Sequence, residues 1–243
     1  MTNTKGMTMT QIDDAELFGN AEDRRAYEDF CANQEAVEKF TLDKPALICR
    51  WRMSNKKVPM LNRHIRALSE RLVQGEPLTH NMLSWAKQHV EWSLAEGDYT
   101  AHDGVLMLVI DVNGNAAMTV GEYEPLADTS AKALRARSAE ARSEADETGV
   151  APELLAAVNN GELAFVAPAD ECLCGTATLI EQLAQTKGIP VTRVDIPAQL
   201  KGALFLVSDE HGVVPATDAD AAESDAATVA FFADGYEKLR ARR

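Results

Sequence analysis

A short turn before a predicted helix carries the residues whose types and spacing most clearly suggest a binding site in this chain. Residues 174–178 read Cys-Gly-Thr-Ala-Thr, and an amphipathic helix is expected over residues 179–186. The first backbone N–H groups of a helix have no partner within the helix, and with the helix dipole they form a binding site for an anion. Thr178 and Glu181 could instead form a capping box, which is a structural use of the same turn.

A second candidate segment follows an apolar run that reads as a strand. Ser208, Asp209, Glu210 and His211 come directly after residues 204–207. Carboxylates and an imidazole invite acid–base chemistry or a metal ion. Ser208, however, lacks the sequence context of a nucleophile elbow. A turn in which the imidazole is simply solvated or hydrogen-bonded is the structural alternative.

The cysteines predict no metal site. Cys31, Cys49, Cys172 and Cys174 match no common zinc-binding spacing, and a Cys-x-Cys pair cannot easily close a disulfide on itself. We expect reduced and mostly buried thiols.

The first half of the chain is expected to form an α+β lobe over residues 21–122, after a disordered tail at residues 1–20. Gly75 is the expected end of its first helix, Thr79 the cap of its second, and Asn113-Gly114 a tight hairpin turn. The expected elements are a strand at 46–53, helices at 61–75 and 79–97, and strands at 105–112 and 116–120.

The second half is expected to form an α/β lobe over residues 131–243, joined to the first by a linker at 123–130. A helix over 130–147 has Leu134 as its one large apolar residue, so it should lie on the surface or against a partner. The other expected elements are strands at 164–166, 191–196 and 204–207, and a final helix that carries Phe231, Phe232, Tyr236 and Leu239.

From about Pro45 to Asp220, the order of these segments resembles the class IV aminotransferase family, which binds pyridoxal phosphate (PLP) in fold type IV. The similarity lies in residues 47–68, in residues 161–168 with the turn after Cys174, and in residues 205–215. The resemblance implies a two-lobed α+β fold with a smaller N-terminal lobe. It also implies a homodimer, and a small amino-acid substrate if the chain is an active aminotransferase or aminodeoxychorismate lyase-like enzyme.

Three phosphate-binding positions of that family are changed in this chain. The family's arginine falls on Ala67, its threonine in the glycine turn on Ala177, and its last serine or threonine on Asp209. A carboxylate a few ångströms from a phosphate dianion costs on the order of 1 kcal/mol or more, even at a high effective dielectric constant. The usual phosphate site is therefore not expected.

The resemblance still suggests candidates for each role. Lys132 is the nearest lysine to the position of the family's catalytic lysine, although a solvated lysine on a charged helix is the alternative. Glu147 is the nearest carboxylate for the pyridine nitrogen, or just the last residue of a polar helix. A rebuilt cofactor site would use residues near the two turns and the first helix, namely Arg66, Gly175, Thr176, Thr178 and Ser208.

Composition limits the remaining functions. The 243 residues include 24 Lys and Arg against 38 Asp and Glu, a net charge of −14 that disfavours nucleic acid as a partner. No apolar run is long enough to span a membrane and the N-terminus has no secretory pattern, so a cytoplasmic protein is expected. We interpret the chain as a fold-retaining homologue that has lost or weakened PLP binding. The alternatives are an active PLP enzyme and an unrelated α+β protein.

Overall fold

The computed structural model describes residues 25, 42–97, 99, 101–150, 153–195 and 200–241. The chain divides into two units, Met1–Thr41 and Leu42–Arg243, and the second unit carries the fold described below. The predicted tail at residues 1–20 lies outside the described residues. The division of the second unit into two lobes joined by a linker stays a prediction.

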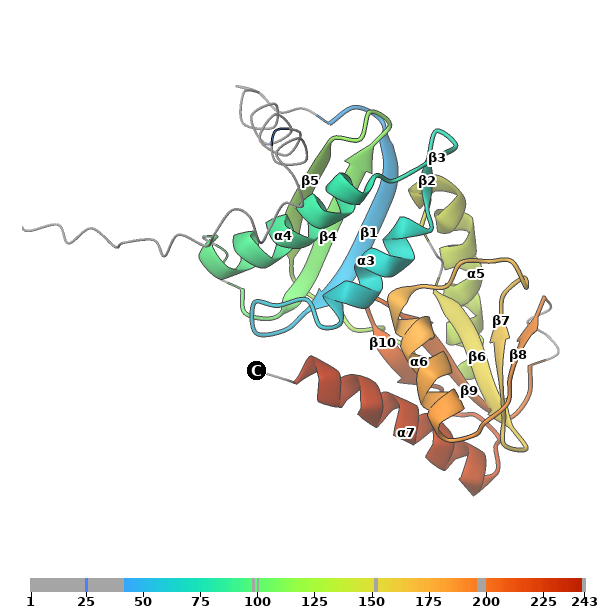
Figure 1. Ribbon diagram of the computed structural model, residues 1–243. Coiled ribbons are helices and arrows are strands. Elements are labelled where there is room, and N and C mark those ends of the chain that lie inside the picture. The colour runs from blue at the N-terminus through green and yellow to red at the C-terminus, as the bar shows by residue number, and fades with distance from the viewer. Residues whose placement is uncertain are drawn as a thin grey trace, which may run out of the picture. The chain divides into compact units, whose positions relative to one another are not determined.

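The first part of this unit is a three-stranded antiparallel sheet in the order β1-β4-β5. Every second residue of β1 is buried, from Leu47 to Met53, because successive side chains of a strand point to opposite faces. The buried face packs against two helices (Figure 1). The elements are β1 (Pro45–Met53), α3 (Leu61–Ser69), β2 (Leu72–Val73), β3 (Glu76–Pro77), α4 (His80–Glu96), β4 (Gly104–Asp111) and β5 (Ala116–Gly121).

The second part is a five-stranded sheet in the order β10-β9-β6-β7-β8. Its pairs are antiparallel except for β7 and β8, which are parallel. The elements are α5 (Ala131–Thr148), β6 (Leu154–Asn159), β7 (Glu162–Val166), α6 (Gly175–Thr186), β8 (Val191–Val194), β9 (Ala203–Ser208), β10 (Gly212–Pro215) and α7 (Glu223–Arg240).

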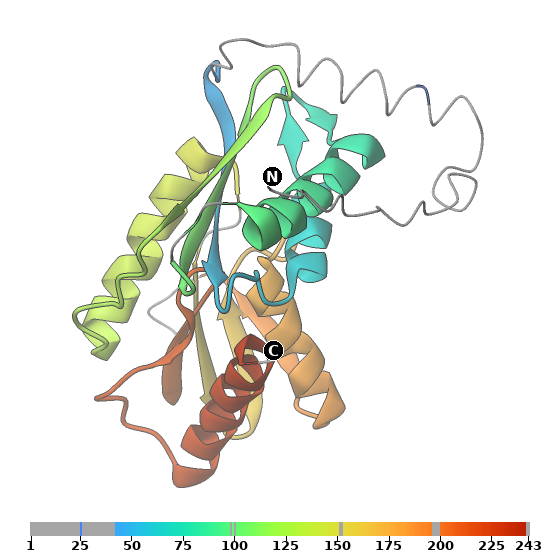
Figure 2. The same ribbon diagram turned by 90° about the vertical axis from the view of Figure 1, so that its left-hand side faces the viewer.

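Helices cover both faces of the second sheet (Figure 2). Leu154, Ala156 and Val158 of β6 pack in one core with residues of α6 and α7. Leu155 and Ala157 pack in another core with Leu134 of α5. A strand buried on both sides has no polar face to present, which explains the nearly continuous apolar runs of β6 and β9.

The structure corrects the predicted end of the first helix. The helix ends at Ser69, and Leu72–Val73 pairs with Glu76–Pro77 as a small hairpin. Gln74 and Gly75 form its turn with φ of 53° and 83°, so Gly75 serves a hairpin turn instead of a helix end. The apolar pattern of residues 61–73 runs past the end of the helix at Ser69 into the first strand of this hairpin, although Leu72 is 58% exposed.

Most other predicted elements are confirmed within a few residues. Thr79 caps α4 by accepting a hydrogen bond from the Met82 N–H. The helix predicted over 130–147 is α5, and it buries Leu134, Ser138 and Ala141 within this chain. Its small residues let it approach the strands closely. Neither strand β6 nor the short strand β10 was predicted.

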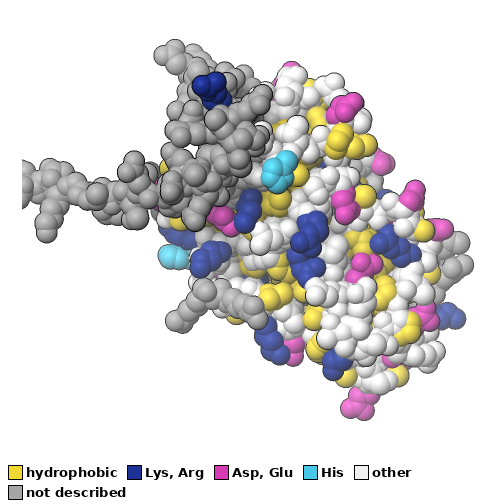
Figure 3. Space-filling view, in the orientation of Figure 1, with side chains coloured by type: hydrophobic (Ala, Val, Ile, Leu, Met, Phe, Trp, Pro, Cys, Tyr) yellow, Lys and Arg dark blue, Asp and Glu magenta, His cyan; other side chains and the backbone are white. Residues whose placement is uncertain are grey.

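Charged side chains of both signs lie on the surface that the described residues form. On the face shown in Figure 3, Lys and Arg side chains are interspersed with Asp and Glu, so this face has no continuous basic patch. Among the described residues, no helix is both long and apolar enough to cross a lipid bilayer.

Candidate functional site

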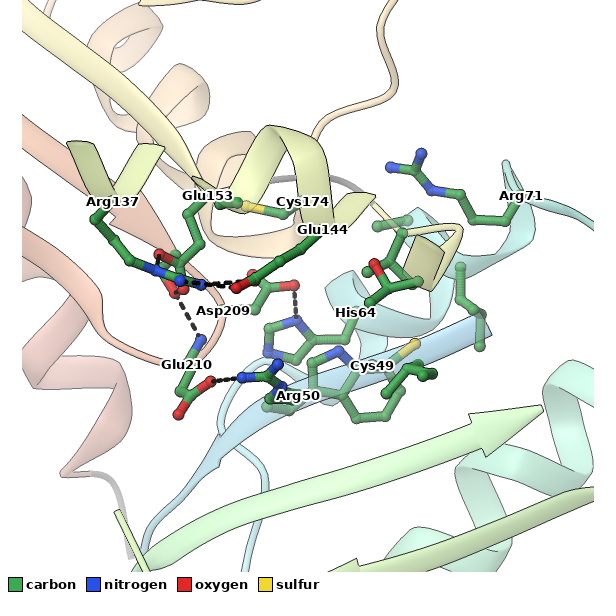
Figure 4. A pocket seen from close by; sticks show the side chains of 18 residues that line it. Cys49, Arg50, His64, Arg71, Arg137, Glu144, Glu153, Cys174, Asp209 and Glu210 are labelled. Atoms are coloured by element: carbon green, nitrogen blue, oxygen red, sulfur yellow. Dashed lines mark hydrogen bonds and ion pairs between the residues drawn. The ribbon is translucent and has the colours of Figure 1, made fainter. Parts of the chain in front are cut away.

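A pocket of about 90 Å³ lies between the two parts of this unit (Figure 4). Strand β1 and helix α3 line one side, and helix α5, the end of β9 and the residues just before β6 and α6 line the other. β1 contributes Cys49, Arg50 and Trp51, and α3 contributes His64 and Ala67. Charged side chains from both parts therefore meet in one partly enclosed space.

Asp209 occupies the end of the pocket next to α6. Its carboxylate accepts hydrogen bonds from the backbone N–H groups of Gly175 at 3.3 Å and Thr176 at 2.7 Å. Cys174, the N-cap residue of α6, makes no side-chain capping bond. Asp209, which follows β9, thus caps a helix whose first residues lie 33 and 34 positions earlier in the sequence.

His64 lies against the same carboxylate. The ring is 3% exposed, stacks on Trp51 with ring centroids 5.3 Å apart, and places Nδ1 3.1 Å from Asp209 Oδ2. Its Nε2 lies 3.1 Å from the carbonyl oxygen of Pro59. Both ring nitrogens therefore lie beside oxygens that can accept a hydrogen bond.

The electrostatics of Asp209 reflect these neighbours. Burial alone would raise the pKa of its carboxyl, but the charge and hydrogen bond of His64 and the N–H of Thr176 outweigh burial and lower the pKa to about 2. The close approach of His64 also explains why residue 175 is a glycine, because a Cβ at this position would lie 2.5 Å from His64 Nδ1.

The opposite end of the pocket is an ion-pair network on α5. Arg137 forms a bidentate pair with Glu144 at 3.0 and 2.8 Å, and its Nε donates to Glu153 at 2.8 Å. The hydrogen bonds that Arg137 donates to Glu144 raise the pKa of Arg137 and lower the pKa of Glu144. Ser208 Oγ donates to Glu153 Oε1 at 3.1 Å and accepts the N–H groups of Glu210 and His211.

Two further arginines complete the lining. Arg50 lies 3.6 Å from Glu210, and Arg71 donates to the carbonyl oxygen of Cys172 at 2.8 Å. Among the described charged residues that line the pocket, Arg71 alone has no carboxylate at ion-pair distance. Nearly all of the pocket's charge is therefore balanced within the chain.

The structure brings only part of the predicted site together. Ser208 lines the pocket, and Gly175 and Thr176 hold Asp209. Thr178 donates to the carbonyl oxygen of Gly175 within α6 and accepts a hydrogen bond from Arg63. Gly175, Thr176 and Thr178 are outside the lining, and so are Arg66, Lys132 and Glu147, whose side chains are exposed.

The capping box at this turn was a wrong alternative. Cys174 is the N-cap, Thr178 lies inside the first turns of α6, and Glu181 pairs with Arg193 at 3.5 Å. The helix starts earlier than residue 178 because Asp209 satisfies the N–H groups of Gly175 and Thr176, a contact that local sequence does not reveal.

A metal ion at the turn after β9 would meet competition. Glu153, Glu210 and His211 place one ligand atom each within 4.8 Å of one another. Both carboxylates already pair with arginines, Glu210 with Arg50 and Glu153 with Arg137. These groups act as partners for Arg50 and Arg137.

Sequence reasoning missed the charged residues of the pocket wall. A signal existed for Arg50, because this arginine interrupts the apolar run of an expected strand. Arg137 and Glu144 are seven residues apart, a spacing that puts them on one face of a helix with Ala141. Nothing in the sequence indicated that this face meets Glu153.

The residues do not fit PLP in the manner that the resemblance implies. Among the described residues that line the pocket there is no lysine to bind the cofactor covalently. Ala67, at the position of the family's phosphate-binding arginine, lines the pocket, whereas Ala177 is fully buried. The N–H groups at the start of α6 are already bound to a carboxylate.

Comparisons with known proteins agree on the fold. No family model and no curated protein matches the chain. Solved structures do match. One, from Thermotoga maritima, is inferred to be a branched-chain amino acid aminotransferase; it is 15% identical, with a TM-score of 0.54 over 85% of this chain and 92% of its own.

Two further structures agree. A hypothetical aminotransferase from Mycobacterium tuberculosis in a PLP-bound form is 11% identical, with a TM-score of 0.52 over 84% of this chain and 95% of its own. A 4-amino-4-deoxychorismate lyase from Pseudomonas aeruginosa is 14% identical, with a TM-score of 0.52 over 81% and 96%. The chain therefore has the fold of the class IV aminotransferases, fold type IV of the PLP-dependent enzymes.

Proposed function

We propose that this chain is a homologue of the class IV aminotransferases that keeps the fold without binding PLP, and that it serves as a binding or partner protein. The observation that carries the proposal is the carboxylate of Asp209 bound at the start of α6. In the family that the sequence resembles, this turn and the segment after the last strand hold the cofactor phosphate.

Electrostatics support the proposal. A phosphate placed beside Asp209 would meet a carboxylate whose pKa is lowered to about 2 and which is therefore charged at neutral pH. It would also find neither the arginine nor the threonine of the family, since these positions are Ala67 and Ala177. Displacing Asp209 would remove the ion-pair partner of the buried His64, which adds to the cost.

The position of Lys132 supports it as well. PLP chemistry requires a lysine amine at the cofactor aldehyde. Lys132 is exposed on α5, outside the pocket lining, whereas Arg137 and Ala141 of the same helix line the pocket. The face of α5 that lines the pocket is therefore not the face that carries Lys132.

Trapping with borohydride tests the proposal. Purified protein is incubated with PLP, reduced with sodium borohydride, digested and analysed by mass spectrometry. We expect a colourless protein and no stoichiometric pyridoxyl adduct on any one lysine. A yellow protein with one adduct per chain on a single lysine would support the alternative, an active PLP-dependent aminotransferase or aminodeoxychorismate lyase-like enzyme with a small amino-acid substrate.

The oligomeric state remains a separate proposal. The resemblance favours a homodimer, and Trp92 on α4 is 59% exposed and available for a contact. Light scattering of the purified protein should give twice the chain mass of 26.4 kDa, and a monomer would count against the dimer.

A further inference from the structure

The turn between β6 and β7 carries an exposed Asn-Gly pair, Asn160-Gly161. Asn159 pairs with Glu162, so the turn has two residues, and their φ values are 52° and 76°. A two-residue hairpin turn with positive φ at both central positions is of type I′. The side chain of Asn160 therefore stands in solvent at the tip of a tight hairpin.

An Asn-Gly pair can modify itself without an enzyme. The backbone nitrogen of the glycine attacks the side-chain carboxamide carbon of the asparagine, a C–N bond forms, and ammonia leaves with the proton of that nitrogen. Water then opens the five-membered imide to aspartate or isoaspartate, so that water is consumed and ammonia is released overall. Glycine favours the attack because it has no side chain beside the nitrogen and restricts the backbone least.

The backbone angle ψ of Asn160 decides whether the attack is possible. In a type I′ turn this ψ is about 30°, which holds the Gly161 nitrogen nearly opposite to the Asn160 side chain. A type II′ turn has a ψ of about −120° at the same position and brings that nitrogen beside the Cβ, as the imide ring requires. Two-residue hairpins adopt either turn, so the strand pairing alone does not prevent a flip of this peptide.

Asp225 opposes this flip. It lies in the first turn of α7, which starts beside the β6–β7 turn (Figure 1), and it is 3% exposed. Its Oδ1 accepts the Gly161 N–H at 3.0 Å, and its Oδ2 accepts the Asn160 N–H at 2.9 Å. A flip would turn the Gly161 N–H away and leave a buried carboxylate oxygen without this donor, which costs free energy.

We propose that Asn160 is a latent deamidation site that Asp225 holds closed. The inference does not depend on whether the pocket binds PLP. Deamidation to isoaspartate would insert an extra carbon into the backbone of a two-residue turn and disturb the pairing of β6 with β7. The carboxylate of Asp225 thus protects this strand pair against chemical ageing.

The chain contains its own control for this chemistry. The sequence has a second Asn-Gly pair, Asn113-Gly114, in the turn between β4 and β5. There the Gly114 N–H donates to the backbone carbonyl oxygen of Asp111 at 3.0 Å. The Asp111 carboxylate accepts the N–H of Asn113 at 2.9 Å. The rate at Asn113 therefore reports on opening of the chain as a whole, whereas the rate at Asn160 also reports on Asp225.

The experiment compares wild type, Asp225→Ala and Asp225→Asn during incubation in mildly alkaline water enriched in the heavy isotope of oxygen. Water that opens the imide labels the product, and peptide mapping by mass spectrometry gives the rate at each Asn-Gly pair. We expect Asn160 to deamidate about tenfold faster in Asp225→Ala than in wild type, the scale of losing charge-assisted hydrogen bonds. Asp225→Asn, which keeps one acceptor oxygen, should lie between the two. The rate at Asn113 should be the same in all three proteins.

Equal rates at Asn160 in wild type and Asp225→Ala would overturn the inference, and so would an equal acceleration at Asn160 and Asn113 in a folded variant. If Asp225→Ala does not fold, Asp225→Asn decides by the same two comparisons. A synthetic peptide of residues 156–165 provides a test that needs no variant. Asn160 in wild type should deamidate at least about tenfold more slowly than in the peptide, because the folded turn must first open. Equal rates in the peptide and in wild type would overturn the inference.

Discussion

The two ends of the pocket neutralise charge by different means. At the α6 end, backbone N–H groups and a buried imidazole hold Asp209. At the α5 end, Arg137 is shared by the side chains of Glu144 and Glu153. Backbone donors come with the fold whatever the sequence, whereas a side-chain network is particular to this chain. The comparison separates hydrogen-bond donors that the backbone of the fold supplies from charged partners that this sequence supplies.

The largest effect should come from removing the carboxylate at the α6 end. Asp209→Ala removes the carboxylate beside the buried His64 and frees the N–H groups of Gly175 and Thr176, so we expect a loss of about 3 kcal/mol in the free energy of unfolding, measured by urea denaturation. Glu210→Ala is the control, because it also removes one negative charge from the pocket. The partner of Glu210 is Arg50, whose side chain is 45% exposed. A surface pair contributes less than about 1 kcal/mol. Equal losses in the two variants would break the comparison.

Acid should weaken the same end. The pKa of Asp209 is lowered to about 2 in the folded protein from 3.8, so its stabilisation is complete above about pH 4 and is lost as the pH falls from there through pH 2. We expect the stability difference between wild type and Asp209→Asn to shrink by about 2 kcal/mol between pH 6 and pH 2. Comparing the two proteins cancels Asp111, whose pKa is lowered as well. A difference that does not change with pH would contradict the contact with His64.

The α5 end should respond less. Arg137→Ala leaves two carboxylates without their shared partner, but Glu144 is 42% exposed and can be hydrated. We expect a loss of about 1–2 kcal/mol by urea denaturation. Arg142→Ala, which removes a 41% exposed partner of Glu171, should cost less than about 1 kcal/mol. A loss for Arg137→Ala larger than that for Asp209→Ala would reverse the ranking of the two ends.

The smallest effect is expected at the predicted catalytic lysine. Lys132 is exposed and outside the pocket, so Lys132→Ala should change stability by less than about 0.5 kcal/mol. It should also leave the borohydride result unchanged. Loss of a specific pyridoxyl adduct in this variant would mean that α5 can present Lys132 to the cofactor.

Sequence alone predicted the fold well, because its signals are local. The alternation along β1, the Thr79 cap and the Asn-Gly turn each depend on neighbouring residues, and each appears in the structure. The end of α3 was missed because Leu72 and Val73 continue the apolar spacing of the helix past its last residue, Ser69, although they pair with Glu76–Pro77 as a strand.

The site was predictable only in part, because its contacts join distant segments. Aligning Asp209 with a phosphate-binding position placed a carboxylate at the right turn. The residue's bonds to Gly175, Thr176 and His64 depend on the packing of α3 against α6, which leaves no local pattern. Lys132 and Glu147 were chosen by nearness in sequence, and the orientation of α5 places them outside the pocket lining.

Fluorescence of Trp51 tests the central claim most directly. This indole lines the pocket, stacks on His64 and is 3% exposed, so PLP bound in the pocket would quench it. Wild type is titrated with PLP, and Trp51→Phe is the control for quenching of Trp85 and Trp92. Our account predicts no saturable quenching that depends on Trp51. Saturable quenching in wild type that is absent in Trp51→Phe would show that the pocket still takes the cofactor, and would contradict it.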